Sequence, residues 1–286
     1  MYIQRRYPFK GLLRWTKKEL IFFIVMVSAV TALYELLDIK WLQVPLTPVG
    51  MIGTAVAFMI GFQNNAAYDR TWEARKIWGG IVNSSRSLII TIKDSFYVHD
   101  SANVKDEKST IKTITHRHIA WLTALRYAMR VKKPWESSAD ADKSTKGYNF
   151  FVPEHHTTLE EELKPYLSDE EYGYVMTKEN KPNALINLQS KHLRRLTDEK
   201  KIWDFSFLNI QQILNDLTAY QGKSERIKNF PYPKQYGSVG YHFVHIFIWL
   251  LPLAIIPTFA KMGVSIAETN PLLGEHFVWF NIPCTV

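Results

Sequence analysis

The chain has 286 residues and a formal net charge of +8, and 47% of its residues are hydrophobic and 14% aromatic. This composition excludes disorder over most of the length and allows one large domain or two. The single cysteine, Cys284, excludes an intramolecular disulfide and a cysteine-rich metal cluster. The positive charge is compatible with nucleic acid, anionic lipid or the cytoplasmic loops of a membrane protein, so the position of the charges has to decide.

Three long apolar segments predict helices that cross a membrane. Residues 20–37 carry one ionisable side chain, Glu35, near their end, and are just long enough for a hydrocarbon core of about 30 Å. Residues 44–62 carry no charge, and residues 239–260 contain prolines that predict a kinked or two-part helix. The alternative for each segment is a buried core helix. A further apolar stretch from residue 276 has about half the ~20 residues that a crossing needs, so either the native C-terminus lies further on or this stretch is no crossing.

Basic residues before the first apolar segment predict the orientation. The positive-inside rule places this end in the cytoplasm, although the same charges also suit binding of anionic membrane lipid. The residues concerned are Arg5, Arg6, Lys10, Arg14, Lys17 and Lys18. We therefore expect a multi-pass protein of the cell inner membrane with a cytoplasmic N-terminus. Its predicted parts are residues 1–62, a cytoplasmic region 63–238, and residues 239–286.

The cytoplasmic region is predicted to be helical, because apolar and charged residues alternate in it with the period of a helix. Plausible helix starts are Asp106, Ser168 and Asp204, and two polar stretches, 97–107 and 132–156, are predicted loops, the second of them mobile. The expected helices are 64–95, 108–131, 157–179, 183–197 and 205–222. No strand alternation stands out, so the predicted fold class is all-α, with membrane helices that continue into a cytoplasmic helical bundle around a central pore.

The second apolar segment presents two different faces. At about 100° per residue, Thr54, Phe58 and Phe62 form one stripe. The adjacent stripe consists of small residues, which let a neighbouring helix approach closely. These residues are Gly50, Gly53, Ala57 and Gly61.

The aromatic stripe either packs into a core or lines a lumen. It continues through Asn65 and Asp69, polar side chains that a dry core would have to satisfy at a cost of several kcal/mol. A water-filled vestibule removes that cost. If several copies surround an axis, the aromatic rings form a hydrophobic constriction that gates by dewetting, and Asp69 forms a negative ring just inside it.

The sequence from Phe58 to Gly79, FMIGFQNNAAYDRTWEARKIWG, resembles the signature of the bestrophin family in its bacterial branch. The basic-aromatic start with Trp15 and the Pro233-Lys-Gln-Tyr236 sequence before the third apolar segment resemble further parts of that family. The resemblance is strong over residues 45–90 and looser elsewhere.

The resemblance implies a homopentameric ion channel with a central pore, a hydrophobic neck and a cytoplasmic vestibule that is closed by a second constriction. The neck pattern falls on Thr54, Phe58 and Phe62, although Thr54 is more polar than the family pattern. The vestibule includes Asn65 and Asp69, and the cytosolic aperture falls near Ile202. The calcium-binding sequence of eukaryotic relatives follows the fourth membrane helix, and this chain ends before that point, so calcium control is unsupported.

No motif of an enzyme is present: the sequence has no phosphate-binding Gly-rich loop, no Gly-x-Ser-x-Gly and no His-Glu-x-x-His. Of the histidines, only His242 and His245 have a spacing that could chelate, and the alternative for them is hydrogen bonding between helices. We expect no cofactor and no metal. The basic residues are dispersed, and no nucleic-acid-binding motif appears, so nucleic acid is not an expected partner.

Ion selectivity is where the two lines of inference disagree. The resemblance implies chloride and other monovalent anions, whereas an unpaired Asp69 ring in the lumen favours monovalent cations. Arg70, Arg75 or Lys76 could neutralise the acid. A cation channel of the same architecture and an accessory membrane protein without a pore therefore remain as alternatives.

Overall fold

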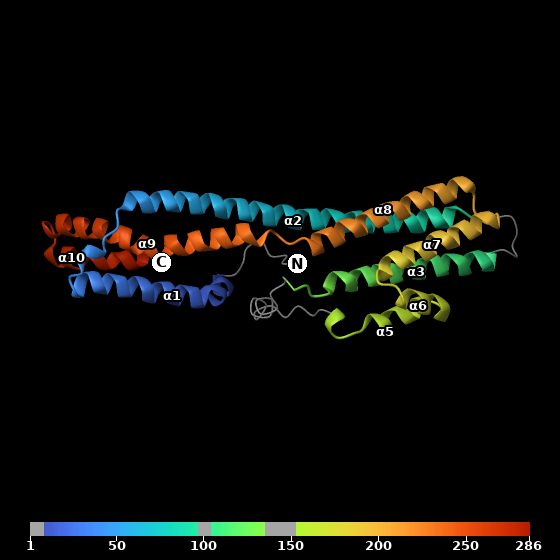
Figure 1. Cartoon of the computed structure of the whole chain (residues 1–286), viewed down its shortest axis with the longest axis horizontal. Coiled ribbons are helices and arrows are strands. Elements are labelled where there is room, and N and C mark those ends of the chain that lie inside the picture. Colours follow the sequence, from blue (N-terminus) through green and yellow to red (C-terminus); the bar gives the residue numbers. More distant parts are fainter. Residues whose placement is uncertain (1–8, 97–103, 135–152) are drawn as a thin grey trace. The chain divides into compact units, whose positions relative to one another are not determined.

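The computed structural model describes residues 9–96, 104–134 and 153–286 (Figure 1). Within these ranges the regular elements are helices, apart from one isolated antiparallel bridge between Phe96 and Ile202. The predicted all-α class is confirmed. By their contacts the described residues form two units: the first holds those up to residue 67 and from 232 onward, and the second holds those between.

The first unit contains three helices that are long and apolar enough to cross a membrane, as predicted. They are α1 (Phe9–Leu36), the N-terminal part of α2 (Leu46–Asp94), and α9 (Lys234–Ala267), with the short η1 (Lys40–Leu42) after α1. Their most apolar windows are only 11–22% buried, which argues against buried core helices. α9 is a single helix with Pro252 and Pro257 inside it, so the two-part alternative is wrong.

Close packing between α2 and α9 depends on one member of the predicted small-residue stripe. A side-chain carbon added at Gly53 would lie 2.7 Å from the Phe247 ring, whereas Gly50 and Gly61 face open space. Further along, the Gln63 Nε2 donates to the backbone oxygen of Tyr236 at 3.3 Å. Within the subunit, Gly53 is therefore the glycine of this stripe that serves helix packing.

The last residues of the first unit form three short helical turns and not a crossing. These are α10 (Pro271–Glu275), η4 (Phe277–Phe280) and α11 (Asn281–Thr285). The fully buried Asn281 side chain donates to the Thr31 hydroxyl of α1 at 3.1 Å, and Val278 packs with Tyr34 and Ile256. An amide in an apolar environment needs such a partner, so this hydrogen bond fixes α11 against α1.

The second unit contains the rest of α2 and a set of helices around one hydrophobic core. They are α3 (Val104–Arg130), α5 (Leu159–Leu163), α6 (Asp169–Met176), α7 (Lys181–Asp198) and α8 (Asp204–Asn229), with η2 (Pro153–His155) and η3 (Lys164–Tyr166). The predicted single helix 157–179 is wrong, because η3 and the extended Leu167 interrupt it. The predicted loops, 97–107 and 132–156, lie mostly outside the described residues, which exclude 97–103 and 135–152.

The predicted helix starts meet different outcomes. Ser168 is the N-cap of α6, with its hydroxyl accepting from the Glu171 backbone N–H. Asp204 is the first residue of α8, after Trp203 at the N-cap. α3 begins at Val104, so Asp106 lies in its first turn, where a carboxylate interacts favourably with the helix dipole.

Candidate pore-lining surface

One face of α2 carries no packing from its own subunit in the first unit. Phe58 and Phe62 are 65% and 70% exposed, and the residues at the same helical phase, Met51, Thr54 and Asn65, are exposed as well. Thr54 donates its hydroxyl to the Gly50 backbone oxygen at 3.0 Å. The Thr54 hydroxyl, which distinguishes this residue from an apolar neck residue, therefore donates its hydrogen bond within its own helix.

The same spacing of three, four and seven residues continues in the part of α2 that belongs to the second unit. The exposed residues there include Asp69, Trp72, Lys76, Asn83, Ile90 and Asp94. We call the exposed residues at this phase of α2, from Met51 to Asp94, the exposed stripe. It carries no charged side chain in the first unit and includes the charged side chains Asp69, Lys76 and Asp94 in the second.

The opposite face of α2 explains why the exposed stripe is free. Ile77, Ile81, Leu88 and Ile92 are buried in the core of the second unit. These positions lie roughly half a turn away from the exposed stripe at 100° per residue. Hydrophobic burial therefore determines which face of α2 points out of the bundle.

Two polar links hold α2 against α8. Arg70 donates to the backbone oxygens of Ile227 and, at 2.8 Å, of Phe230, where α8 ends. These carbonyls have no hydrogen-bond partner within the helix, and the helix dipole favours a positive charge at the C-terminal end. Glu73 forms an ion pair with Arg226 of α8. Both links fix the segment of α2 around Arg70 and Glu73 against the C-terminal end of α8.

The basic residues near Asp69 do not neutralise it within the subunit. Arg70 is bound to α8, and the Arg75 guanidinium lies over the Trp72 ring at 5.5 Å, with Trp72 stacked on Tyr68. Asp69 makes no ion pair or hydrogen bond with another residue in the described ranges, and the same holds for Lys76. Asp69 and Lys76 on the exposed stripe therefore remain available to solvent and ions.

The residue predicted near the cytosolic aperture, Ile202, lies in the interior of the second unit. Ile202 is only 2% exposed, packs in the core of the second unit and pairs with Phe96. A side chain enclosed in its own subunit offers no surface to a passing ion. Instead, Phe205 and Leu208 at the start of α8 are 83% and 62% exposed, and their spacing of three places them on one face. The sequence signal for them was present: two large apolar residues in a first turn that the core does not use.

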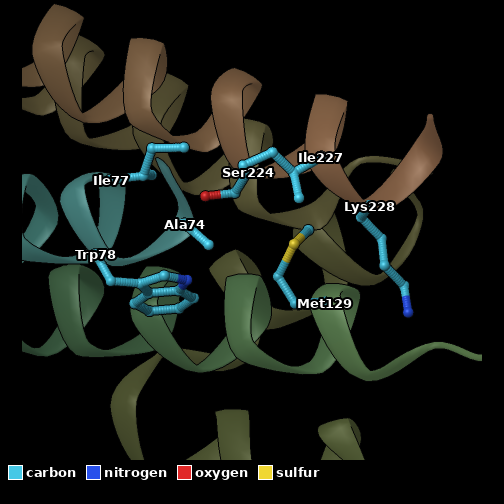
Figure 2. Close-up of a pocket in the computed structure, with 7 residues that line it drawn as sticks. All are labelled: Ala74, Ile77, Trp78, Met129, Ser224, Ile227 and Lys228. Carbon is cyan, nitrogen blue, oxygen red and sulfur yellow. The ribbon is translucent and has the colours of Figure 1, made fainter. Parts of the chain in front are cut away.

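A small cavity lies in the second unit between α2, α3 and α8 (Figure 2). Its volume is about 160 Å³, and its walls are mainly apolar. The lining residues are Ala74, Ile77, Trp78, Met129, Ser224, Ile227 and Lys228. The Ser224 hydroxyl is already bound to the Tyr220 backbone oxygen at 2.9 Å. The cavity wall carries one charged side chain, Lys228.

Buried polar residues of the second unit form a structural network. Arg117 binds Glu171, Gln189 at 2.7 Å and His192 at 3.1 Å, which joins α3, α6 and α7. Burial lowers the pKa of His192, and the neighbouring Arg117 lowers it further. Burial also lowers the pKa of His118, which stacks on Trp121, to about 4. These histidines are neutral at pH 7 and contact core residues.

The predicted pair His242 and His245 belongs to α9 of the first unit. The His245 ring lies 2.8 Å, by its Nδ1, from the Tyr241 backbone oxygen and contacts the Tyr241 ring. Within the described ranges, no group of three or more His, Cys, Asp and Glu side chains could hold a metal ion.

Comparison with known families identifies the architecture. A sequence model described as bacterial/fungal bestrophin protein matches residues 13–268, most of the chain. The chain belongs to this bestrophin family. The resemblance inferred from the Phe58–Gly79 sequence is therefore confirmed, and family membership agrees with the prediction that this bestrophin is not an enzyme.

Named relatives are channel-forming proteins. The voltage-dependent anion channel-forming protein YneE of Escherichia coli K12 is 28% identical over 234 residues, which cover 82% of this bestrophin and 65% of YneE. The voltage-dependent anion channel-forming protein RSc3414 of Ralstonia nicotianae is 24% identical, covering 87% of this chain and 73% of the relative. This bestrophin thus spans about two thirds of the length of YneE.

Solved structures share the fold. The crystal structure of a point mutant of a bacterial bestrophin homolog from Klebsiella pneumoniae superposes with a TM-score of 0.68 at 21% identity, covering 92% of this chain and 87% of that one. A further crystal structure, described as that of a membrane protein, gives a TM-score of 0.69 at 19% identity, covering 94% and 83%.

Proposed function

We propose that this bestrophin forms an ion channel that passes monovalent anions, chloride among them, across a membrane. Several copies surround an axis, and the exposed stripe of α2 from each copy lines the passage. Thr54, Phe58 and Phe62 form the hydrophobic neck, and Asn65 and Asp69 line the vestibule beyond it. The names of the relatives, anion channel-forming proteins, support anions as the permeant class.

The exposed stripe is the observation that carries this proposal. A stripe with two phenylalanines more than 60% exposed is unfavourable at a water-facing surface, and the same stripe continues into the exposed charges Asp69 and Lys76. A narrow aqueous passage accommodates both, because apolar rings form a constriction and charged rings face water.

The number of subunits follows from the family resemblance, which implies a homopentamer. A cyclic assembly brings the same side chain of every copy to the axis, so one exposed residue becomes a ring. At the inner end, Phe205 and Leu208 replace Ile202 as the proposed aperture. Native mass spectrometry of the detergent-purified protein measures the subunit number directly, and a monomer would favour the accessory alternative.

The deciding experiment for function is a reversal potential in planar bilayers under a KCl gradient. The expected sign is that of an anion-selective current, and a cation-selective current would support the alternative drawn from Asp69. Phe58→Ala and Phe62→Ala should each raise the conductance and weaken closure, because a smaller side chain widens the neck and lets water persist in it. Unchanged currents in both variants would mean that these rings face other helices and not the pore.

For orientation we propose the inner membrane, with the N-terminus and the region 63–238 in the cytoplasm. The basic residues before the first apolar segment support this direction by the positive-inside rule. Reporter fusions at the N-terminus and within residues 135–152 distinguish the two sides of the membrane. Activity of both fusions on the cytoplasmic side is the expected result.

A further inference from the structure

We propose that Lys76 is the residue that gives the channel its preference for anions. The proposal rests on the channel function above and assigns selectivity to one ring within it. Lys76 belongs to the exposed stripe, at nearly the same helical phase as Phe58 and Asp69. At a rise of 1.5 Å per residue, its Cα lies roughly 10 Å beyond that of Asp69 along α2.

Lys76 differs from Arg70 and Arg75 because its side chain has no bonding partner among the described residues. Arg70 is committed to the carbonyls at the end of α8, and Arg75 lies over the Trp72 ring. The acid one turn before Lys76 is Glu73, and its carboxylate is paired with Arg226. Within the described residues Lys76 itself has no hydrogen bond, ion pair or ring contact, so its charge is presented to solvent.

Asp69 and Lys76 then form two rings of opposite sign in succession. Their separation of roughly 10 Å is close to the Debye length of about 8–10 Å at physiological salt, so each ring keeps its own local field. An anion that has crossed the neck is repelled at Asp69 and attracted at Lys76, and a cation meets the reverse. Lys76 therefore offsets the barrier that Asp69 presents to anions, which reconciles an anion channel with an acidic vestibule.

Exposed charges elsewhere on α2 provide a matched control. Arg86 is also exposed and likewise without a partner in the described ranges, but ten residues further on it lies about 80° around the helix from Lys76. Lys76→Gln and Arg86→Gln each remove one positive charge per subunit from the same helix. Only the first removes it from the exposed stripe.

Reversal potentials of wild type, Lys76→Gln, Lys76→Arg and Arg86→Gln under the same KCl gradient test the proposal. The permeability ratio of chloride to potassium should fall roughly 30-fold in Lys76→Gln, because one unit charge about 4 Å away in water changes the occupancy of chloride by a factor of about five to six and that of potassium by the same factor in the opposite direction. Lys76→Arg and Arg86→Gln should keep the wild-type ratio. An unchanged ratio in Lys76→Gln overturns this inference while the channel function stands, whereas the absence of current in the wild type overturns the channel function itself.

If Lys76→Gln yields no current, Lys76→Cys in a Cys284→Ser background replaces it, because Cys284 is the one native cysteine. A positively charged methanethiosulfonate reagent added to open channels should raise the chloride-to-potassium ratio, and a negatively charged one should lower it. Currents that neither reagent changes would show that position 76 does not face the ions.

Discussion

Two adjacent glycines on α2 allow a sharp test of how this helix packs in the second unit. A side-chain carbon added at Gly80 would lie 2.4 Å from Cζ and 2.5 Å from Cε1 of Tyr220 in α8. The same carbon at Gly79 would meet nothing within 4 Å. Gly80→Ala and Gly79→Ala therefore make the same chemical change one residue apart, with and without a collision.

The expected magnitudes follow from two opposing effects. Alanine in place of glycine inside a helix is worth about 1 kcal/mol of stability, which both variants gain. Overpacking a filled site costs about 1–3 kcal/mol, which only Gly80→Ala loses. Tyr220 packs against the core cluster, so its ring has to move by roughly an ångström to restore ordinary contact. Gly79→Ala should thus stabilise the protein, and its free energy of unfolding should be about 1–3 kcal/mol higher than that of Gly80→Ala.

Thermal unfolding of the detergent-purified variants, followed by tryptophan fluorescence, measures the difference. For a unit of this size 1 kcal/mol shifts the midpoint by about 2–4 °C. In a Tyr220→Ala background the collision partner is gone, so Gly80→Ala should stabilise by as much as Gly79→Ala. Equal midpoints for the two glycine variants in the wild-type background would refute the packing of α2 on Tyr220.

Three further predictions concern charge and polarity. His118 should lower the free energy of unfolding by about 3 kcal/mol between pH 6.5 and pH 4, because the unfolded chain protonates this histidine first; His118→Phe should reduce the loss of stability over this range by that amount in denaturant titrations. Arg70→Gln should destabilise by about 1–3 kcal/mol, since it uncouples α2 from the α8 carbonyls, and Arg75→Gln serves as its control. Asp69→Asn should raise the chloride-to-potassium permeability ratio in bilayers; a lower ratio would contradict a lumen-facing carboxylate.

Local patterns in the sequence were sufficient for the membrane helices and for the phase of α2. The apolar lengths of residues 20–37, 44–62 and 239–260 depend only on composition within each segment, and each became a helix of sufficient length. The stripe through Phe58, Phe62 and Asp69 depends only on the helical period, so it could be drawn before any packing was known.

Breaks inside the second unit were harder to predict. The stretch 157–179 has helical periodicity, yet Pro165 and the N-capping Ser168 divide it into α5, η3 and α6. Both residues were visible, but periodicity outweighed them in the prediction. Ile202 was assigned to an aperture by alignment alone, and its burial follows from packing against helices that lie far away in the sequence.

The chain by itself thus determined that α2 has an apolar, then charged face, because side-chain direction in a helix is a local property. Only the tertiary structure decided which charges on that helix are free. Arg70 and Glu73 find their partners on α8, more than 150 residues later, at Phe230 and Arg226. Partnership between distant residues depends on how helices pack, and in the described residues this packing leaves Asp69 and Lys76 among the charges of the exposed stripe that have no partner.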